Sequence, residues 1–215
     1  FHAVLGGEAG EAVFADFSAA LQKAQAEGRI LTASLFRYEN HLFFYAEGLN
    51  RPFTPQGLCP ALDAALLPWP PALGEAAPRP WAAMQPYFYH DVPTTAADWQ
   101  QGRCPQRRRG RIALLPPDSW CSYMEHHLRI VTEGLVEGDR WHLICVQEGV
   151  LFSYLEEPRT NVNIKHRPGA HSPELDAWIA ADPESHFARF TPEQKAHPDS
   201  GHNFVFLPRI AGTED

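Results

Sequence analysis

The sequence lacks several features that would place it in a familiar class. No apolar run reaches the ~18 residues that a membrane-spanning helix needs. The cysteines include no C-x-x-C pair, which argues against a zinc knuckle and against a dithiol redox motif. The opening letters FHAVLGGEAG do not have the layout of a signal peptide, and whether a segment before Phe1 was removed stays open. We therefore expect a cytoplasmic protein with no membrane partner, whose thiols at Cys59, Cys104, Cys121 and Cys145 are reduced and incidental.

Positive charge is also scarce. The chain carries 18 Lys and Arg against 26 Asp and Glu, a formal net charge of -8, so no nucleic-acid partner is expected. The single basic run, RCPQRRRGR at 103–111, has the charge for a local phosphate site, but a solvated linker is the simpler interpretation. The remaining composition, 44% hydrophobic and 20% charged over 215 residues, is that of one large or two small globular domains.

What the sequence does contain is an internal repeat. The motif Leu-Phe-x-Tyr-x-Glu occurs at residues 42–47 and again at 151–156, 109 positions later, which is about half the chain. The flanking patterns follow the same order in both halves. The first half predicts a strand at 1–7, a helix at 8–29, strands at 30–40 and 41–49, a short helix at 59–69 and a strand at 86–92. The second half predicts a strand at 111–117, a helix at 118–138, strands at 139–147 and 149–157, a helix at 172–190 capped by Ser172, and a strand at 202–210.

This order is the ferredoxin-like βαββαβ arrangement, so the predicted fold class is α+β. A four-stranded sheet with helices on one face must bury its other face, and two repeats can do this by packing sheet to sheet. We predict an intrachain pseudo-dimeric α+β barrel with a degenerate first repeat at 1–93, a linker at 94–110 and a second repeat at 111–215. Because the partner is already covalently attached, the chain is expected to be a monomer or a weak homo-oligomer.

The stretch WCSYMEHHLRI at 120–130 carries the most suggestive polar pair. Tyr123 and His127 are four residues apart on the predicted helix and project from the same face. Histidine can both give and take a proton near neutral pH, whereas His126 is turned by about 100° and is expected to face solvent. A helical metal motif would need a second histidine at position 131, which is Val131, so no metal is predicted. The alternative is that Tyr123 and His127 are ordinary packing residues with one satisfied hydrogen bond.

Four motifs of the second half occur in the order of a known family. They are Tyr123-x-x-x-His127 on the first helix, LFSYLE at 151–156, Trp178 on the second helix and NFVFLP at 203–208. Residues 111–210 thereby resemble the L-rhamnose mutarotase family, which are small α+β-barrel sugar epimerases acting at the anomeric carbon. The family carries a Trp pair late in the second helix, where this chain has only Phe187 and Phe190. The first helix of the first half lacks both Tyr and His, so any activity is expected in the second half alone.

The resemblance implies an isomerase that interconverts the anomers of an aldose such as L-rhamnose. His127 would be the acid/base and Tyr123 would bind a sugar hydroxyl or hold the imidazole. Glu156 and Trp178 are further candidates, and Trp141 and Tyr154 could supply the aromatic surfaces that a sugar site uses. No cofactor and no metal are implied, and the partner would be a small-molecule sugar.

Two other functions remain open. The protein could be a non-catalytic α+β barrel that binds a small polar ligand, which the degenerate first half favours. It could also belong to the wider α+β-barrel class, which includes small monooxygenases and haem-handling proteins, although that possibility rests on fold analogy alone.

Overall fold

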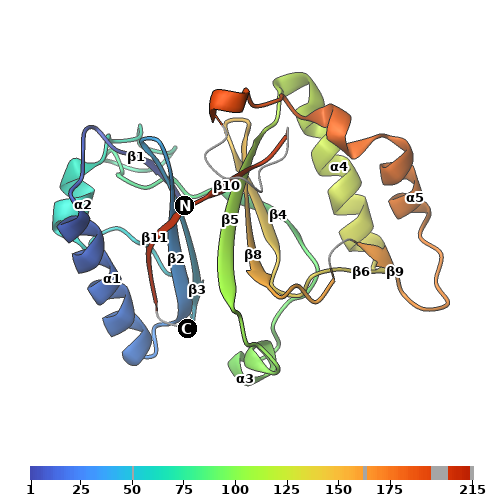
Figure 1. Ribbon diagram of the computed structural model, residues 1–215, viewed down its shortest axis with the longest axis horizontal. Coiled ribbons are helices and arrows are strands. Elements are labelled where there is room, and N and C mark those ends of the chain that lie inside the picture. The colour runs from blue at the N-terminus through green and yellow to red at the C-terminus, as the bar shows by residue number, and fades with distance from the viewer. Residues whose placement is uncertain (50, 162–163, 195–202, 214–215) are drawn as a thin grey trace. The chain divides into compact units, whose positions relative to one another are not determined.

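The computed structural model describes residues 1–49, 51–161, 164–194 and 203–213, and the chain divides into two compact units (Figure 1). Unit 1 comprises residues 1–84 together with 208–215, and unit 2 comprises residues 85–207. Both are mixed α+β structures with antiparallel sheets, as the sequence predicts. The four cysteines are free thiols, buried at Cys59 and Cys145 and exposed at Cys104 and Cys121.

Unit 1 is a four-stranded sheet in the order β1-β3-β2-β11. The strands are β1 (His2–Val4), β2 (Ile30–Tyr38), β3 (His41–Gly48) and β11 (Arg209–Gly212), and the helices are α1 (Glu11–Ala26) and α2 (Pro60–Ala65). Helix α1 ends just before Gly28, whose φ of 68° lies in the left-handed region that glycine adopts without strain. Its apolar residues Phe14, Phe17 and Leu21 recur at helical spacing, which turns one face of α1 toward the sheet.

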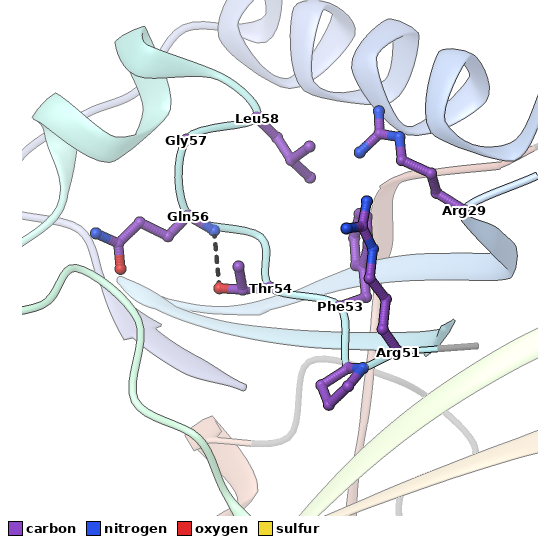
Figure 2. Close-up of a pocket in the computed structure, with 8 residues that line it drawn as sticks. Arg29, Arg51, Phe53, Thr54, Gln56, Gly57 and Leu58 are labelled. Carbon is purple, nitrogen blue, oxygen red and sulfur yellow. Dashed lines mark hydrogen bonds between the residues drawn. The ribbon is translucent and has the colours of Figure 1, made fainter. Parts of the chain in front are cut away.

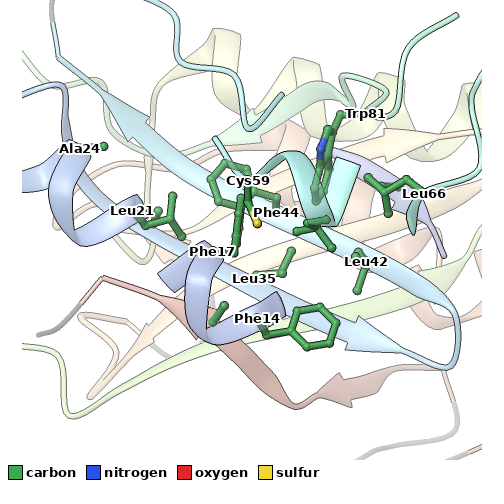
Figure 3. Close-up of a cluster of buried hydrophobic side chains, with 14 of the residues drawn as sticks. Phe14, Phe17, Leu21, Ala24, Leu35, Leu42, Phe44, Cys59, Leu66 and Trp81 are labelled. Carbon is green, nitrogen blue, oxygen red and sulfur yellow. The ribbon is translucent and has the colours of Figure 1, made fainter. Parts of the chain in front are cut away.

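The core of unit 1 is built around aromatic rings (Figure 3). The ring of Phe17 lies 5.7 Å from that of Phe44 and 6.2 Å from that of Trp81, between centroids. Leu35 and Leu42 of the sheet are fully buried against them. The indole nitrogen of Trp81 donates to Asp63 Oδ1 at 2.9 Å, so the one polar atom of this ring is satisfied. The face of α1 that meets this core is apolar, with Phe14, Phe17, Leu21 and Ala24 buried on it.

Unit 2 contains a five-stranded sheet in the order β10-β5-β8-β7-β4 and a small sheet of β6 and β9. The strands are β4 (Gln85–Tyr89), β5 (Arg107–Leu114), β6 (Val136–Glu137), β7 (Leu143–Gln147), β8 (Val150–Glu157), β9 (Lys165–His166) and β10 (Val205–Leu207). The helices are α3 (Ala96–Gln100), α4 (Pro117–Glu133) and α5 (Pro173–Ala180), with 3₁₀ turns η1 (Pro183–His186) and η2 (Pro192–Gln194). Helix α4 packs against β4, α5 and η1, which places its inner face over the sheet.

Both predicted helices of unit 2 are shorter in the structure. Helix α4 stops at Glu133 because Gly134 adopts a φ of 68° and ends the helix in a left-handed turn. Helix α5 stops at Ala180, since Asp182 has a φ of 51° and Pro183 cannot continue the hydrogen-bond ladder. The predicted Ser172 cap is confirmed: its hydroxyl accepts from the Leu175 amide at 3.0 Å.

Strand pairing assigns the chain to its units in a way that differs from the sequence prediction. Strand β4, expected to close the first half, pairs with β7 in unit 2, and β11 at the chain end pairs with β2 in unit 1. The range 94–110, predicted as a linker, contains α3 and the first residues of β5. The physical reason is local: the Thr95 hydroxyl caps α3 by accepting from the Asp98 amide at 3.0 Å, and Arg107 to Gly110 pair with β8.

The 109-residue repeat recurs in local geometry. Glu39 and Glu148, 109 positions apart, begin the two hairpin turns with φ values of 53° and 50°. Within the shared motif, the Tyr45 hydroxyl donates to Glu47 Oε1 at 2.5 Å, and the Tyr154 hydroxyl donates to Glu156 Oε1 at 2.6 Å. The two hairpins therefore share both a turn conformation and a side-chain hydrogen bond.

Candidate functional site

The interior of unit 2, between α4 and the five-stranded sheet, contains the predicted Tyr–His pair. Tyr123 and His127 are both buried, 4% exposed each, and their rings lie 4.3 Å apart. The His127 ring stands edge-on to two rings of β4, 4.9 Å from Phe88 and 5.6 Å from Tyr87. Because α4 is amphipathic and packs on β4, the i, i+4 spacing brings both polar rings to the same buried face.

The hydrogen bonding of His127 defines its protonation state. Its Nδ1 lies 2.9 Å from the backbone carbonyl oxygen of Tyr123, and a carbonyl only accepts, so Nδ1 carries a proton. Burial, opposed by this hydrogen bond, lowers the pKa of His127 to about 4, and burial raises the pKa of Tyr123 to about 12. At neutral pH the imidazole is therefore uncharged with an accepting Nε2, beside a phenol that keeps its proton.

Trp178 of α5 completes an aromatic wall beside this pair. Its indole lies 5.2 Å from the Tyr123 ring and 4.7 Å from the His127 ring. Phe187, on the segment after η1, lies 5.1 Å from Tyr123 between ring centroids. Of the predicted site residues, the structure thus brings together Tyr123, His127 and Trp178.

His126 does not face solvent, contrary to the sequence prediction. It is half-buried, its ring lies 5.3 Å from Trp178 and 6.5 Å from His186, and its Nδ1 is buried. The reason is that α5 and η1 cover the side of α4 that the helical rotation gives to this residue. Tyr123, His126, Trp178 and His186 therefore line one continuous aromatic cluster.

An unusual number of buried polar atoms in unit 2 have no hydrogen-bond partner among the described residues. Buried polar groups in folded proteins are nearly always satisfied, so each unsatisfied one indicates a bound water, ligand or ion. These atoms include His90 Nε2, Arg111 Nε, His126 Nδ1, His142 Nε2, Ser153 Oγ, His186 Nδ1 and Asn203 Oδ1. Three of these histidines lie close enough to His127 to act on it electrostatically, namely His126, His186 and His90. Their grouping indicates a polar site buried inside unit 2.

Several of these residues were missed by sequence reasoning. Arg111 and Ser153 are directly opposite each other in the β5–β8 register, and Ile144 pairs with Ser153 on the next strand. The signal that could have found them is strand alternation: Ala113, two residues after Arg111, is a fully buried core residue and shares its face. His90 and His142 gave no comparable signal, because only the pairing of β4 with β7 brings them near α4.

Three predicted binding residues lie elsewhere in unit 2. Tyr154 and Glu156 are on the sheet face opposite to Leu151, which packs in the same core as Tyr123. Glu156 is held by Arg103 Nη2 at 2.6 Å and Arg108 Nε at 3.5 Å, with all three side chains buried. The Trp141 indole donates to the Trp99 carbonyl at 3.1 Å.

The basic run at 103–111 is not a solvated linker. Arg109 pairs with Glu157 at 2.9 Å and stacks 3.8 Å over the ring of Phe206, beside the Arg103 and Arg108 pairs with Glu156. Glu156 and Glu157 at the end of β8 therefore form ion pairs with arginines in and just before the start of β5. This network accounts for Glu156 without a ligand.

One group in the described part of the chain has metal-ligand spacing. Ligand atoms of His166, His171 and Asp176 lie within 4.8 Å of one another. However, the Ser172 amide donates to His166 Nδ1 at 3.1 Å, so neutral His166 carries its proton on Nε2, the atom that faces Asp176 at 3.4 Å. A protonated nitrogen cannot bind a metal, and a hydrogen-bonded pair explains the arrangement.

Unit 1 has a surface cavity of about 400 Å³ that the sequence did not indicate (Figure 2). Arg29 and Arg51 extend in the same direction along one side of it, with Leu58 across from them. Arg29 lies 6.0 Å from the centre of the Phe53 ring, and its Nε is already paired with Glu27 at 2.8 Å. The cavity is open and most of its lining is exposed, so it offers a surface for small anions rather than an enclosed reaction site.

Comparisons with known proteins give no match: no family model, no curated protein and no solved structure resembles the chain closely enough to report. Among the described residues, no helix has both the length and the apolarity to cross a bilayer. The function must therefore be argued from the geometry of unit 2.

Proposed function

We propose that the Tyr123–His127–Trp178 cluster is the active site of a sugar isomerase of the mutarotase type, which interconverts the anomers of an aldose. The observation that carries the proposal is the pair itself: a neutral imidazole with a free Nε2 and a protonated phenol, 4.3 Å apart and buried under an indole. Sugar sites combine an aromatic surface with a few polar groups, and this cluster has both.

Mutarotation needs two proton transfers and no net change in atoms. His127 Nε2 accepts the proton of the anomeric hydroxyl while the bond from the anomeric carbon to the ring oxygen breaks. Tyr123 supplies a proton to that oxygen, which gives the open-chain aldehyde. Rotation about the bond between the aldehyde carbon and its neighbour, followed by the reverse transfers, closes the ring on the other face. The two transfers leave an imidazolium beside a phenolate, a pair with no net charge, and the reverse transfers restore both groups.

We also propose that the chain is a tandem of two ferredoxin-like repeats that form a duplicated α+β barrel, working as a monomer or a weak homo-oligomer. The shared turn conformation and the shared Tyr–Glu hydrogen bond, 109 residues apart, support this duplication. The positions 109 residues before Tyr123 and His127 are Phe14 and Ser18, and Phe14 belongs to an apolar core. Only the second repeat would therefore carry the chemistry.

The test is magnetisation transfer between the two anomeric proton signals of a free sugar, measured by NMR across a panel that begins with L-rhamnose. Wild-type protein is expected to accelerate exchange for at least one sugar, and His127→Ala to abolish the acceleration. His171→Ala, an exposed histidine of the same unit, is the matched control and should leave exchange unchanged. Exchange that survives His127→Ala would remove this residue from the mechanism, and sugar binding without exchange would favour the non-catalytic alternative.

A further inference from the structure

Arg111 is a half-buried cation, with a buried Nε and no counterion in the described part of the chain. Its Nε is buried with no hydrogen-bond partner, and its guanidinium makes no ion pair there. It stacks 4.3 Å over the ring of Phe204, which covers one face of the planar group without satisfying its Nε–H. Burial lowers the pKa of Arg111 to about 10, so the charge persists at neutral pH.

The neighbours of Arg111 place this charge at the proposed active site. Tyr123, Arg159, Glu184 and Tyr87 are the groups that act on it electrostatically. Arg159 is neutralised by Asp139, with its Nε 3.0 Å from Asp139 Oδ2, and Glu184 is exposed and hydrogen-bonded to Asn203. The buried Tyr87 hydroxyl is hydrogen-bonded to that of Tyr123, and the Tyr87 ring lies 5.6 Å from the His127 ring. Arg111, with its unpaired Nε, and Tyr87 therefore flank the catalytic pair.

A buried charge without a counterion destabilises the folded state. Removing the partner of a buried arginine typically costs a protein several kcal/mol of stability. An arginine in such a position is explained if a ligand supplies the opposite charge. A carboxylate is the natural complement, since a guanidinium presents two parallel N–H donors that match its two oxygens. One unpaired cation balances a monoanion, whereas a phosphate monoester would leave about one negative charge buried without compensation.

We infer that the site of unit 2 accepts an anionic sugar, a hexuronate, whose carboxylate is held by Arg111 with the Tyr87 hydroxyl while its anomeric end reaches Tyr123 and His127. This inference rests on the proposed mutarotase function for the reaction and goes beyond it in the substrate class. It assigns Arg111 and Tyr87 to recognition and leaves proton transfer to the Tyr–His pair.

The experiment compares matched sugars and matched variants. The sugars are D-galacturonate, its methyl ester, D-galactose and D-galactose 6-phosphate, each assayed at pH 7 for anomeric exchange and for stabilisation of the protein against thermal unfolding. Three variants are compared. Arg111→Met keeps the side-chain length without the charge, and Arg111→Lys keeps the charge without the two parallel N–H donors of the guanidinium. Arg107→Met is the third. Arg107 is the control because it is an exposed arginine of the same strand, 56% exposed at its side chain.

For wild type we expect exchange of galacturonate to be accelerated roughly 10- to 100-fold more than that of galactose or of the ester, the range of a charge-assisted hydrogen bond. Arg111→Met should erase this preference, Arg111→Lys should retain part of it, and Arg107→Met should keep it. Circular dichroism shows whether each variant is folded.

Failure of the inference and failure of the proposed function give different results. Equal exchange of acid and neutral sugars, unaltered by Arg111→Met, overturns the anionic substrate and leaves the mutarotase proposal standing. Thermal stabilisation by galacturonate that depends on Arg111, without exchange of any sugar, supports the carboxylate site and removes the catalysis. If galactose 6-phosphate shows faster exchange or greater thermal stabilisation than galacturonate, the carboxylate assignment is overturned. If no sugar shows exchange or stabilisation, both proposals are overturned.

Discussion

His127 Nδ1 lies 2.9 Å from the backbone carbonyl oxygen of Tyr123, one helical turn earlier in α4. This bond orients the imidazole and fixes its tautomer, because the acceptor cannot donate. The nitrogen left over, Nε2, then has a lone pair. The helix that positions the histidine thus also sets its chemical role, with no second side chain required.

The low pKa of His127 predicts a stability that depends on pH. The pKa is about 4 in the folded chain, mainly because of burial, against 6.5 for the unfolded group. Between these values the unfolded state binds more protons, so stability is full above pH 6.5 and falls as the pH drops toward 4. The loss from this residue is at most about 3 kcal/mol. Urea unfolding at pH 7.5, 6, 5 and 4.5 should show it, with a shallower pH dependence for His127→Gln. If the unfolding free energy of His127→Gln depends on pH as steeply as that of wild type, His127 does not take up a proton on unfolding. His171→Gln is the control and is expected to match wild type.

Glu156 is predicted to stabilise unit 2 without taking part in catalysis. Glu156→Gln removes the carboxylate that holds the buried Arg103 and Arg108, which should cost roughly 3–5 kcal/mol of unfolding free energy. Glu125→Gln breaks the exposed pair with Arg129 and should cost less than about 1 kcal/mol. Urea unfolding measures both. Anomeric exchange per folded molecule should be unchanged in Glu156→Gln, and its loss would return Glu156 to the substrate site.

We predict that position 138 must be glycine because the His90 ring packs against its backbone. A Cβ at this position would lie 1.8 Å from the His90 ring atoms Nε2 and Cδ2, so the imidazole would have to move. Gly138→Ala should destabilise the protein by roughly 1–3 kcal/mol, the usual cost of overpacking. Gly7→Ala is the matched control, since nothing lies within 4 Å of a Cβ there. Thermal unfolding measures the difference, and equal effects of the two substitutions would show that His90 is free to relocate.

Local patterns made much of the fold predictable. The two hairpins, the Ser172 cap and the Tyr–His pair on one helix face each depend on residues within a few positions of one another. Strand pairing across long separations was not readable in this way. Nothing near β4 indicates that it joins β7 rather than β1, and the presence of Tyr87, Phe88 and His90 beside α4 follows from that pairing.

The candidate site shows where one-dimensional reasoning failed. Tyr154 and Glu156 resemble site residues in sequence. Because side chains alternate along β8, however, both lie on the sheet face opposite to that of Leu151. Arg111 was concealed by the basic run around it, in which Arg108 pairs with Glu156 on the opposite face and Arg109, on the same face as Arg111, pairs with Glu157. Alternation within β5 separates Arg111 from Arg108 alone, and the pairing of Arg109 with Glu157 is known only from the structure.

Trp178 is predicted to keep the His127 pKa low by excluding water from one side of the ring, 4.7 Å away. Trp178→Ala should admit water and raise the pKa of His127 from about 4 toward 6.5, because desolvation is the largest cause of its shift. The same change should lower stability by roughly 3–5 kcal/mol, whereas Trp178→Phe keeps an aromatic ring and should preserve most of the shift. The ring-proton chemical shifts of His127, followed by NMR between pH 7.5 and 5, report the titration directly. If the pKa stays near 4 in a folded Trp178→Ala variant, the neighbouring His126, His186 and His90, and not exclusion of water by the indole, hold the imidazole neutral.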